Sequence, residues 1–244
     1  MESSEYQRLY ELEEQFWWFQ GMQHITRALL NKYSDSSMEQ KLLDAGCGTG
    51  GMFSLLSQFG HTTGIDSSTK ALELAAKRKN SILVQADVSY LPFTENSFDI
   101  VTSLDVLYHL NVKNDVEVLK ELVRVMRPGG IMLLRVPAFN QLRSTHDEVV
   151  HTRQRYGKSE LITKLEQANL DILFVSYANC LLFPIAVAYR YFLQPKTHGS
   201  DLHALNPYLN MALTLLLKLE AYLLKHFRLP FGLSLVAIIK KNHL

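Results

Sequence analysis

A glycine-rich turn after a short apolar run is the feature that most restricts how this chain folds. The run Lys41–Ala45 is mostly apolar and carries Asp44 next to its end, and four glycines then fall within Gly46–Gly51. A second apolar segment, Met52–Leu56, begins directly after the turn. This order is typical of a parallel strand that leads into the amino end of a helix, through a turn whose bare backbone a ligand can approach closely. The class of that ligand decides the function of the chain.

The spacing of the glycines allows two kinds of ligand. Gly46, Gly48 and Gly51 satisfy the G-x-G-x-x-G pattern of dinucleotide-binding turns. Asp66 follows twenty residues after the first of them, where an acid that binds ribose is expected. Gly46, Gly48 and Gly50 equally satisfy the tighter G-x-G-x-G spacing. Spacing alone therefore leaves a dinucleotide and a different nucleoside cofactor open.

The charge of Asp44 separates these ligands. A carboxylate two residues ahead of the first glycine repels a pyrophosphate and attracts an ammonium or sulfonium group. S-adenosylmethionine (SAM) has both cations and no phosphate, so the acid favours SAM. Two further acids end predicted strands. Asp66 is suited to hold the ribose hydroxyls by charge-assisted hydrogen bonds, and Asp87 can accept a hydrogen bond from an adenine amine.

Further motifs follow in order along the chain, at Leu91–Phe93, Ser97–Ser103 and Arg127–Leu134. With the D-x-G-C-G-x-G turn, which here is Asp44–Gly50, they make the chain resemble class I SAM-dependent methyltransferases, in particular the small-molecule, type 11-like group. The resemblance covers roughly residues 42–136. It implies SAM as the cofactor and an α/β fold with a Rossmann-like, doubly wound sheet. That sheet has seven mostly parallel strands, and its last strand is antiparallel.

The alternation of apolar runs and amphipathic segments predicts the elements of this sheet. We expect strands near residues 41–45, 62–66, 82–85, 98–103, 130–136, 171–177 and 232–239. We expect helices near residues 5–30, 51–59, 68–79 and 113–126, with another that begins at Lys158. The chain then divides into an N-terminal helical cap (1–35), a SAM-binding Rossmann-like core (36–180), an apolar helical insertion (181–230) and the last core strand (231–244).

The predicted insertion contains two strongly apolar segments, Leu181–Tyr189 and Met211–Glu220. In the second helix Asn210, Thr214 and Lys218 recur every four residues and form a narrow polar stripe. Charged residues interrupt the segment too soon for a membrane span of about 20 residues, so no transmembrane span is predicted. Four roles stay open: a lid over a hydrophobic substrate pocket, a homodimer interface, a peripheral membrane contact, and packing against the core of the fold.

Composition limits the partners and the compartment. The 244 residues carry a formal net charge of +1, and no basic run interleaves with aromatic residues, so nucleic acid is not an expected partner. Cys47 and Cys180 are the two cysteines, and they cannot build a disulfide framework. The first residues, Met1–Glu5, are acidic and lack the apolar core of a signal peptide. Together these features predict a cytoplasmic protein.

Four consecutive aromatic residues, Phe16–Phe19, lie in the predicted N-terminal helix. Side chains at successive helical positions point in different directions, so some are predicted to cover a ligand cleft. The alternative, that these residues hold the helix to the sheet, stays open. Similar methyltransferases place such a helix over the methionyl end of SAM, which implies Trp18 at the cofactor and Trp17 at the substrate. Gln20–Met22 stands where many of these proteins carry an arginine.

The methyl acceptor is expected beyond the carboxyl ends of the fourth and fifth strands, because ligands of open α/β sheets bind there. A hydroxyl or carbon acceptor also needs a base to remove its proton. His109 is the first candidate, since similar methyltransferases often carry a histidine near this place. Further candidates are His146 and His151 for catalysis, and Tyr108, Arg153 and Tyr156 for substrate binding. The acids and histidines of this region match no metal-ligand spacing, so no metal is predicted.

These observations predict a SAM-dependent methyltransferase that acts on a small, partly hydrophobic metabolite, on oxygen in preference to nitrogen or carbon. The predicted cofactor contacts are Asp44, Gly46, Cys47, Gly48, Gly50, Asp66, Ser67, Asp87, Val88, Leu104 and Trp18. Two other functions stay open. One is an NAD(P)-dependent oxidoreductase that uses the G-x-G-x-x-G turn. The other is a SAM-binding module that associates with a membrane or a partner without transferring methyl groups.

Overall fold

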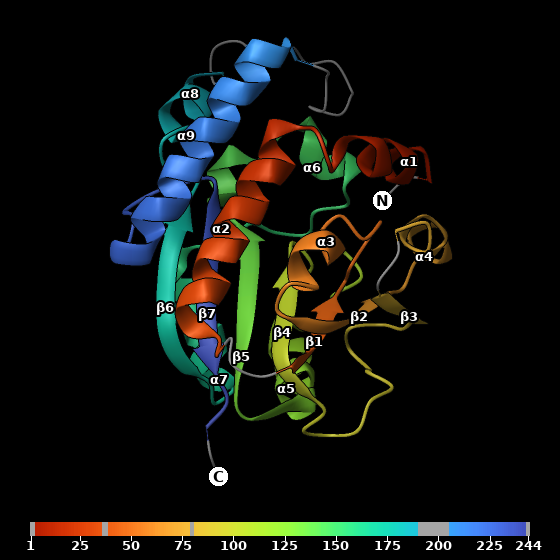
Figure 1. Cartoon of the computed structure of the whole chain (residues 1–244). Helices are drawn as coiled ribbons and strands as arrows, with labels where there is room; N and C mark the ends of the chain where they lie inside the picture. The colour runs from red at the N-terminus through yellow and green to blue at the C-terminus, as the bar shows by residue number, and fades with distance from the viewer. Residues whose placement is uncertain (1–2, 36–38, 79–80, 190–204, 243–244) are drawn as a thin grey trace.

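A seven-stranded sheet with the strand order β3-β2-β1-β4-β5-β7-β6 runs through the molecule (Figure 1). The computed structural model describes residues 3–35, 39–78, 81–189 and 205–242. The strands are β1 (Gln40–Ala45), β2 (Gly60–Asp66), β3 (Ser81–Gln85), β4 (Phe98–Leu104), β5 (Met126–Pro137), β6 (Asp171–Ala178) and β7 (Ser234–Lys240). β7 runs antiparallel to both of its neighbours, and the other pairs are parallel. The predicted fold class is confirmed.

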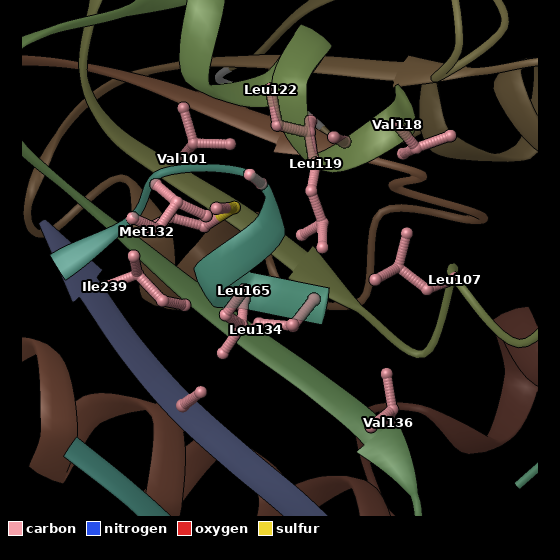
Figure 2. Packing of buried hydrophobic residues seen from close by; sticks show 14 of the residues in the cluster. Val101, Leu107, Val118, Leu119, Leu122, Met132, Leu134, Val136, Leu165 and Ile239 are labelled. Atoms are coloured by element: carbon pink, nitrogen blue, oxygen red, sulfur yellow. The ribbon is translucent and has the colours of Figure 1, made fainter. Parts of the chain in front are cut away.

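Helices cover both faces of this sheet. They are α1 (Ser3–Leu12), α2 (Trp17–Tyr33), α3 (Phe53–Leu56), α4 (Thr69–Ala75), α5 (Asp115–Val125), α6 (Thr145–Val149), α7 (Lys158–Gln167), α8 (Phe183–Ala188) and α9 (Pro207–His226). α2 and α9 lie side by side across one face (Figure 1). On the other face Leu119 of α5 and Leu165 of α7 pack against Met132 and Leu134 of β5 (Figure 2).

Strand β5 shows how one sequence serves both faces. Met132 and Leu134 belong to the core under α5 and α7, whereas Ile131 and Leu133 belong to the core under α2 and α9. Because successive side chains of a strand point to opposite faces, Arg135 lies on the same face as Leu133. The sheet therefore places a guanidinium on the face that α2 covers.

The N-terminal segment differs from its prediction. A single helix over residues 5–30 was expected, and that expectation is wrong: α1 ends at Leu12 and α2 begins at Trp17. Residues 13–16 form a turn, in which Phe16 is buried. The break lets α1 turn away from α2 and lie beside α4. The N-terminal residues therefore reach the glycine-rich turn as well as the sheet.

The predicted insertion contributes α8 and α9, and its residues 190–204 lie outside the described residues. The polar stripe of α9 faces α2, since Thr214 Oγ1 lies 3.2 Å from Gln20 Oε1. Apolar side chains of α9, Leu215 and Leu219 among them, are more than half exposed instead. Nowhere in the described part of the chain does a helix combine the length and apolar character that crossing a bilayer requires. The predicted domain boundaries stay a prediction.

Candidate functional site

The glycine-rich turn between β1 and α3 has the conformation that its glycines allow. Gly46, Gly48 and Gly50 have φ angles of 85°, 54° and 79°, in the left-handed region that side chains disfavour. A Cβ at Gly46 would come within 2.3 Å of a methyl carbon of Val106, whereas a Cβ at Gly48 would meet nothing within 4 Å. The backbone at Gly48 is therefore open to a ligand.

A cavity of about 240 Å³ adjoins this turn. Its floor is the sheet, at Asp44, Leu104 and Arg135, and one side is the turn itself. α2 forms a wall, and α1 with the turn after it forms the roof. The lining residues are Glu5, Leu9, Glu13, Trp18, Phe19, Met22, Gln23, Asp44, Gly46, Cys47, Gly48, Gly51, Met52, Leu104, Asp105, Tyr108, Arg135 and Val150. The cavity thus lies at the carboxyl ends of β1 and β4, where the strand order reverses.

Asp44 is a buried acid at the floor of the cavity. Its carboxylate accepts a hydrogen bond of 2.7 Å from Thr102 Oγ1 on β4. Burial raises the pKa of Asp44 to about 6, although the Thr102 hydroxyl and the charge of Arg135 act against the increase. A buried carboxylate with so few donors is stabilised by a cationic ligand. This is the property for which Asp44 was singled out in the sequence.

Arg135 and Asp105 form an ion pair at the opposite side of the floor. Arg135 Nε and Nη2 lie 2.8 Å and 2.7 Å from Asp105 Oδ2. Arg135 Nη1 is buried and has no hydrogen-bond partner among the described residues. Asp105 has a φ of 61°, and its backbone N–H donates to the carbonyl of Arg135 at 2.9 Å. The role of Arg135 was missed, although a charge within the apolar run 131–136 was a signal for it.

Glu13 brings a further acid to the cavity, from the turn between α1 and α2. Its carboxylate accepts hydrogen bonds from Thr49 Oγ1 at 2.5 Å and from Arg78 Nη2 at 3.2 Å. Burial raises the pKa of Glu13 to about 7. Arg78 also donates to the carbonyls of Thr49 and Tyr10, each at 2.9 Å. Arg78 therefore fastens the roof of the cavity to the glycine-rich turn.

Comparisons with known proteins identify the kind of domain that contains this cavity. Residues 43–134 match the family described as "Methyltransferase domain". The chain carries a class I SAM-dependent methyltransferase domain. SAM is the cofactor of this domain, and the site fits it: Asp44 can bind a cation, and the turn at Gly48 has a bare backbone.

Curated relatives of the methyltransferase domain are named for different substrates. The bovine (Bos taurus) protein named "Probable tRNA methyltransferase 9B" is 36% identical over 101 residues, which are 41% of this chain and 22% of that protein. A demethylmenaquinone methyltransferase of Staphylococcus aureus is 37% identical over 125 residues, 45% of this chain and 51% of that protein. The chain thus spans about half or less of the length of these relatives.

A solved structure extends the likeness to the whole fold. It is a complex between the Haloferax volcanii Trm112 methyltransferase activator and a chain assigned as a methyltransferase. The match has a TM-score of 0.62 at 16% identity and covers 97% of this chain and 94% of that chain. At this identity the likeness shows the fold alone.

The predicted ribose and adenine residues lie at the ends of β2 and β3. Asp66 accepts hydrogen bonds from the backbone N–H groups of Gly48 at 2.9 Å and Ser68 at 2.8 Å, so it also holds the glycine-rich turn of the methyltransferase domain in place. Ser67 and Asp87 are exposed, and Val88 is buried in the core. These four residues do not line the cavity, and their roles toward SAM stay predictions.

The aromatic residues divide between the cavity and the α9 face of the domain. Trp18 and Phe19 line the cavity, whereas Trp17 does not. The backbone N–H of Trp17 donates to Asn210 Oδ1 of α9 at 2.9 Å, and its ring packs in the core under α2 and α9. Cys47 lines the cavity as a buried thiol, and burial raises its pKa. The structure therefore brings Trp18 and Cys47, which were predicted at the cofactor, to the cavity, but not Trp17, which was predicted at the substrate.

Two of the three candidate histidines lie together beside the cavity. The ring centres of His109 and His151 are 5.8 Å apart. His109 Nδ1 accepts the backbone N–H of Asn111 at 3.2 Å, which leaves Nε2 to carry the proton of the neutral ring. Burial lowers the pKa of His109 to about 4. Neither ring lines the cavity, although Tyr108 and Val150 do.

The side chain of His146 lies outside the described residues. Within the described part of the chain, no three His, Cys, Asp or Glu side chains lie close enough together to hold a metal ion.

Arg153 and Tyr156, predicted at the substrate, lie in a polar cluster around buried Asp115 of α5. Arg153 forms an ion pair with Asp115, and Tyr156 Oη donates to Asp115 Oδ2 at 3.1 Å. Lys164 Nζ of α7 also lies 2.8 Å from Asp115. The Tyr156 ring belongs to the core under α5 and α7, so the structure does not bring these two residues to the cavity.

Proposed function

We propose that this protein transfers a methyl group from SAM to a small, partly hydrophobic metabolite, on oxygen in preference to nitrogen or carbon. The observation that supports the proposal is the mixed lining of the cavity. Acids gather at the glycine-rich turn, whereas Leu9, Phe19 and Met22 supply apolar surface from α1 and α2. The first part suits the cations of SAM, and the second suits an acceptor with apolar groups.

The residues of the site divide the work of the reaction. When bound, SAM supplies a methyl group that is activated by its sulfonium leaving group. Asp44 and the backbone at Gly46 and Gly48 hold the methionyl end. Trp18 and Phe19 cover the cavity from α2 and exclude water, and a water-free site aligns the acceptor and prevents side reactions. The face of an aromatic ring also attracts a cation.

A hydroxyl acceptor must lose a proton, and His109 is the proposed base. Its pKa of about 4 keeps the ring neutral at pH 7, as a base must be. To accept a proton at Nδ1, the ring must give up the hydrogen bond from the Asn111 N–H. Catalysis by His109 therefore requires a rearrangement of the segment after β4. His151 and His146 are proposed as alternatives. The ring of His151 lies beside that of His109, and both residues belong to the segment that follows β5.

The experiment is release of S-adenosylhomocysteine (SAH) by the purified protein in a metabolite extract, with mass spectrometry of compounds that gain one methyl group. We expect turnover by the wild-type protein and none by Asp44→Asn. Purified tRNA serves as a comparison acceptor, since one curated relative is named for tRNA, and no methylation of it is expected. Turnover that persists in Asp44→Asn would remove Asp44 from the site.

A thermal-shift comparison tests the other two functions. We expect SAM and SAH to raise the melting temperature and NAD(P) to leave it unchanged. Stabilisation by NAD(P) alone would favour the oxidoreductase. Stabilisation by SAM without SAH release in any extract would favour a module that binds SAM without transferring methyl groups.

We also propose that two copies of the protein associate through α9. Its exposed apolar residues, Met211, Leu215, Leu219 and Tyr222, recur along one side of the helix. Leu215→Glu with Leu219→Glu is expected to convert a dimer to a monomer in sedimentation experiments. Flotation with liposomes tests the alternative of a peripheral membrane contact. We further propose that the protein is located in the cytoplasm.

A further inference from the structure

The guanidinium of Arg135 has hydrogen-bonding capacity that the described residues do not use. Its side chain is only 10% exposed and lines the cavity. Asp105 occupies the edge formed by Nε and Nη2, whereas Nη1 is buried and has no partner among the described residues. A buried donor without a partner is rare in native proteins. Because Arg135 lines the cavity, a ligand bound there is the candidate acceptor for Nη1.

The charges around Arg135 restrict the nature of that ligand. The other charged residues that line the cavity are all acids: Glu5, Glu13, Asp44 and Asp105. Such a set repels an anion of high charge, for example a phosphate. A single carboxylate that is joined to a cationic group fits better, because the carboxylate can accept from Arg135 while the cation meets an acid.

Asp44 is an acid in the required place. In the register of the sheet Asp44 lies opposite Thr102 of β4, and Arg135 lies opposite Leu104 of the same strand. Arg135 is thus two strands away from Asp44, across β4, and two residues nearer to the carboxyl ends, on the same face. The wall of α2 supplies Trp18, Phe19, Met22 and Gln23, and none of these is a cation.

We propose that Arg135 binds the α-carboxylate of the methionyl group of SAM, while Asp44 binds the ammonium on the same carbon. The proposal rests on the proposed function, because it assigns one end of the same cofactor. Nη1 and Nη2 together can donate two parallel N–H groups to a carboxylate. Asp105 retains the edge at Nε and orients the guanidinium, so Asp105 is a positioning residue.

Calorimetric titration with two ligands tests the assignment. SAH has the amino-acid end, and 5′-methylthioadenosine lacks it. Loss of a charged hydrogen bond in a buried site predicts that Arg135→Gln binds SAH about 10- to 100-fold more weakly than the wild-type protein. The affinity for 5′-methylthioadenosine is expected to stay within about threefold, because this ligand does not reach Arg135. The ratio of the two affinities is therefore the readout.

Two further variants control for the ion pair. Arg135→Gln leaves Asp105 without its partner, so the charge-balanced Arg135→Gln/Asp105→Asn variant is titrated as well. This variant is expected to bind SAH more weakly and to keep its affinity for 5′-methylthioadenosine. Asp105→Asn keeps the guanidinium and is expected to retain SAH affinity within about threefold. Equal losses for both ligands, or unchanged SAH affinity in the charge-balanced variant, would overturn the assignment. A wild-type protein that binds neither ligand would overturn the proposed function as well.

Discussion

Gly21 of α2 lies directly against Leu217 of α9. A Cβ at Gly21 would come within 2.1 Å of Leu217 Cδ1 and 2.7 Å of Leu217 Cβ. Leu217 is completely buried, so it has no free space into which it can move. The absence of a side chain at one position therefore sets how closely the N-terminal helix and the insertion helix approach each other.

The first prediction concerns this contact. Gly21→Ala should lower the free energy of unfolding by about 1–3 kcal/mol, because overpacking outweighs the gain in helix propensity. In a Leu217→Ala background the contact with Cδ1 is gone and only the contact with Cβ remains, so the same substitution should cost less than in the wild-type background. Denaturant titrations of the four proteins measure both effects. An equal cost of Gly21→Ala in both backgrounds would show that the contact is not the cause.

The second prediction concerns Glu220 of α9, which is completely buried. Its carboxylate accepts the backbone N–H groups of Asn179 and, at 3.0 Å, of Leu181, in the turn after β6. Glu220→Ala leaves both donors unpaired and should lower the free energy of unfolding by about 2–4 kcal/mol. Lys218→Ala, at an exposed position of the same helix outside the proposed dimer face, should change it by no more than about 0.5 kcal/mol. Comparable losses in the two variants would contradict the proposed role of Glu220.

The third prediction concerns pH and Asp44. The folded-state pKa of Asp44, about 6, is above its ordinary value of 3.8. The protonated acid therefore makes its full contribution to the stability of the ligand-free protein below pH 3.8. That contribution is lost as the pH rises through about 6. SAH needs the ionised carboxylate, so its affinity should change in the opposite direction and fall about tenfold between pH 7 and pH 5. Calorimetric titrations at both pH values measure the change.

Glu13 is the control for this prediction, since its pKa is raised to about 7 in the same cavity. The measurements are therefore repeated with Glu13→Gln and with Asp44→Asn/Glu13→Gln. We expect the dependence of SAH affinity on pH to survive the first substitution and to disappear with the second. A dependence that disappears with Glu13→Gln alone would assign the titration to Glu13.

The fourth prediction concerns His109. If His109 is the catalytic base, turnover should fall about 10²-fold or more in His109→Gln, with little change in SAH affinity. His61→Gln, at an exposed position, is the matched control and should have wild-type turnover. A rate for His109→Gln within a few-fold of wild type would show that the ring is not the base. Its role would then be structural, as the acceptor of the hydrogen bond from the Asn111 N–H.

Most of the sheet could be predicted because its strands are buried and form apolar runs between turn residues. The last strand, for example, has six successive buried residues before Lys240, and it was expected within two residues of its observed start. The glycine-rich turn could be predicted as well, since three of its glycines have φ angles that other residues disfavour. Local sequence was sufficient in both places.

The rest of the site depends on contacts between residues that are far apart in the sequence. The break between α1 and α2 has no glycine or proline to mark it, and Glu13 is held there by Thr49 and Arg78. Which tryptophan faces the cavity depends in turn on Asn210 of α9, which binds the backbone of Trp17. Neither the break between the two helices nor the orientation of the tryptophans can be predicted from helical periodicity alone.

The antiparallel direction of β7 also separates the two ends of the described chain. α1 forms part of the roof of the cavity, at the carboxyl ends of β1 and β4. β7 ends at Lys240, which pairs with Ile131 of β5 at the opposite ends of the strands (Figure 1). A fusion partner or affinity tag joined ahead of α1 would therefore emerge beside the ligand. The same addition after β7 would leave the entrance clear, which makes the carboxyl end the better place to immobilise the protein for binding measurements.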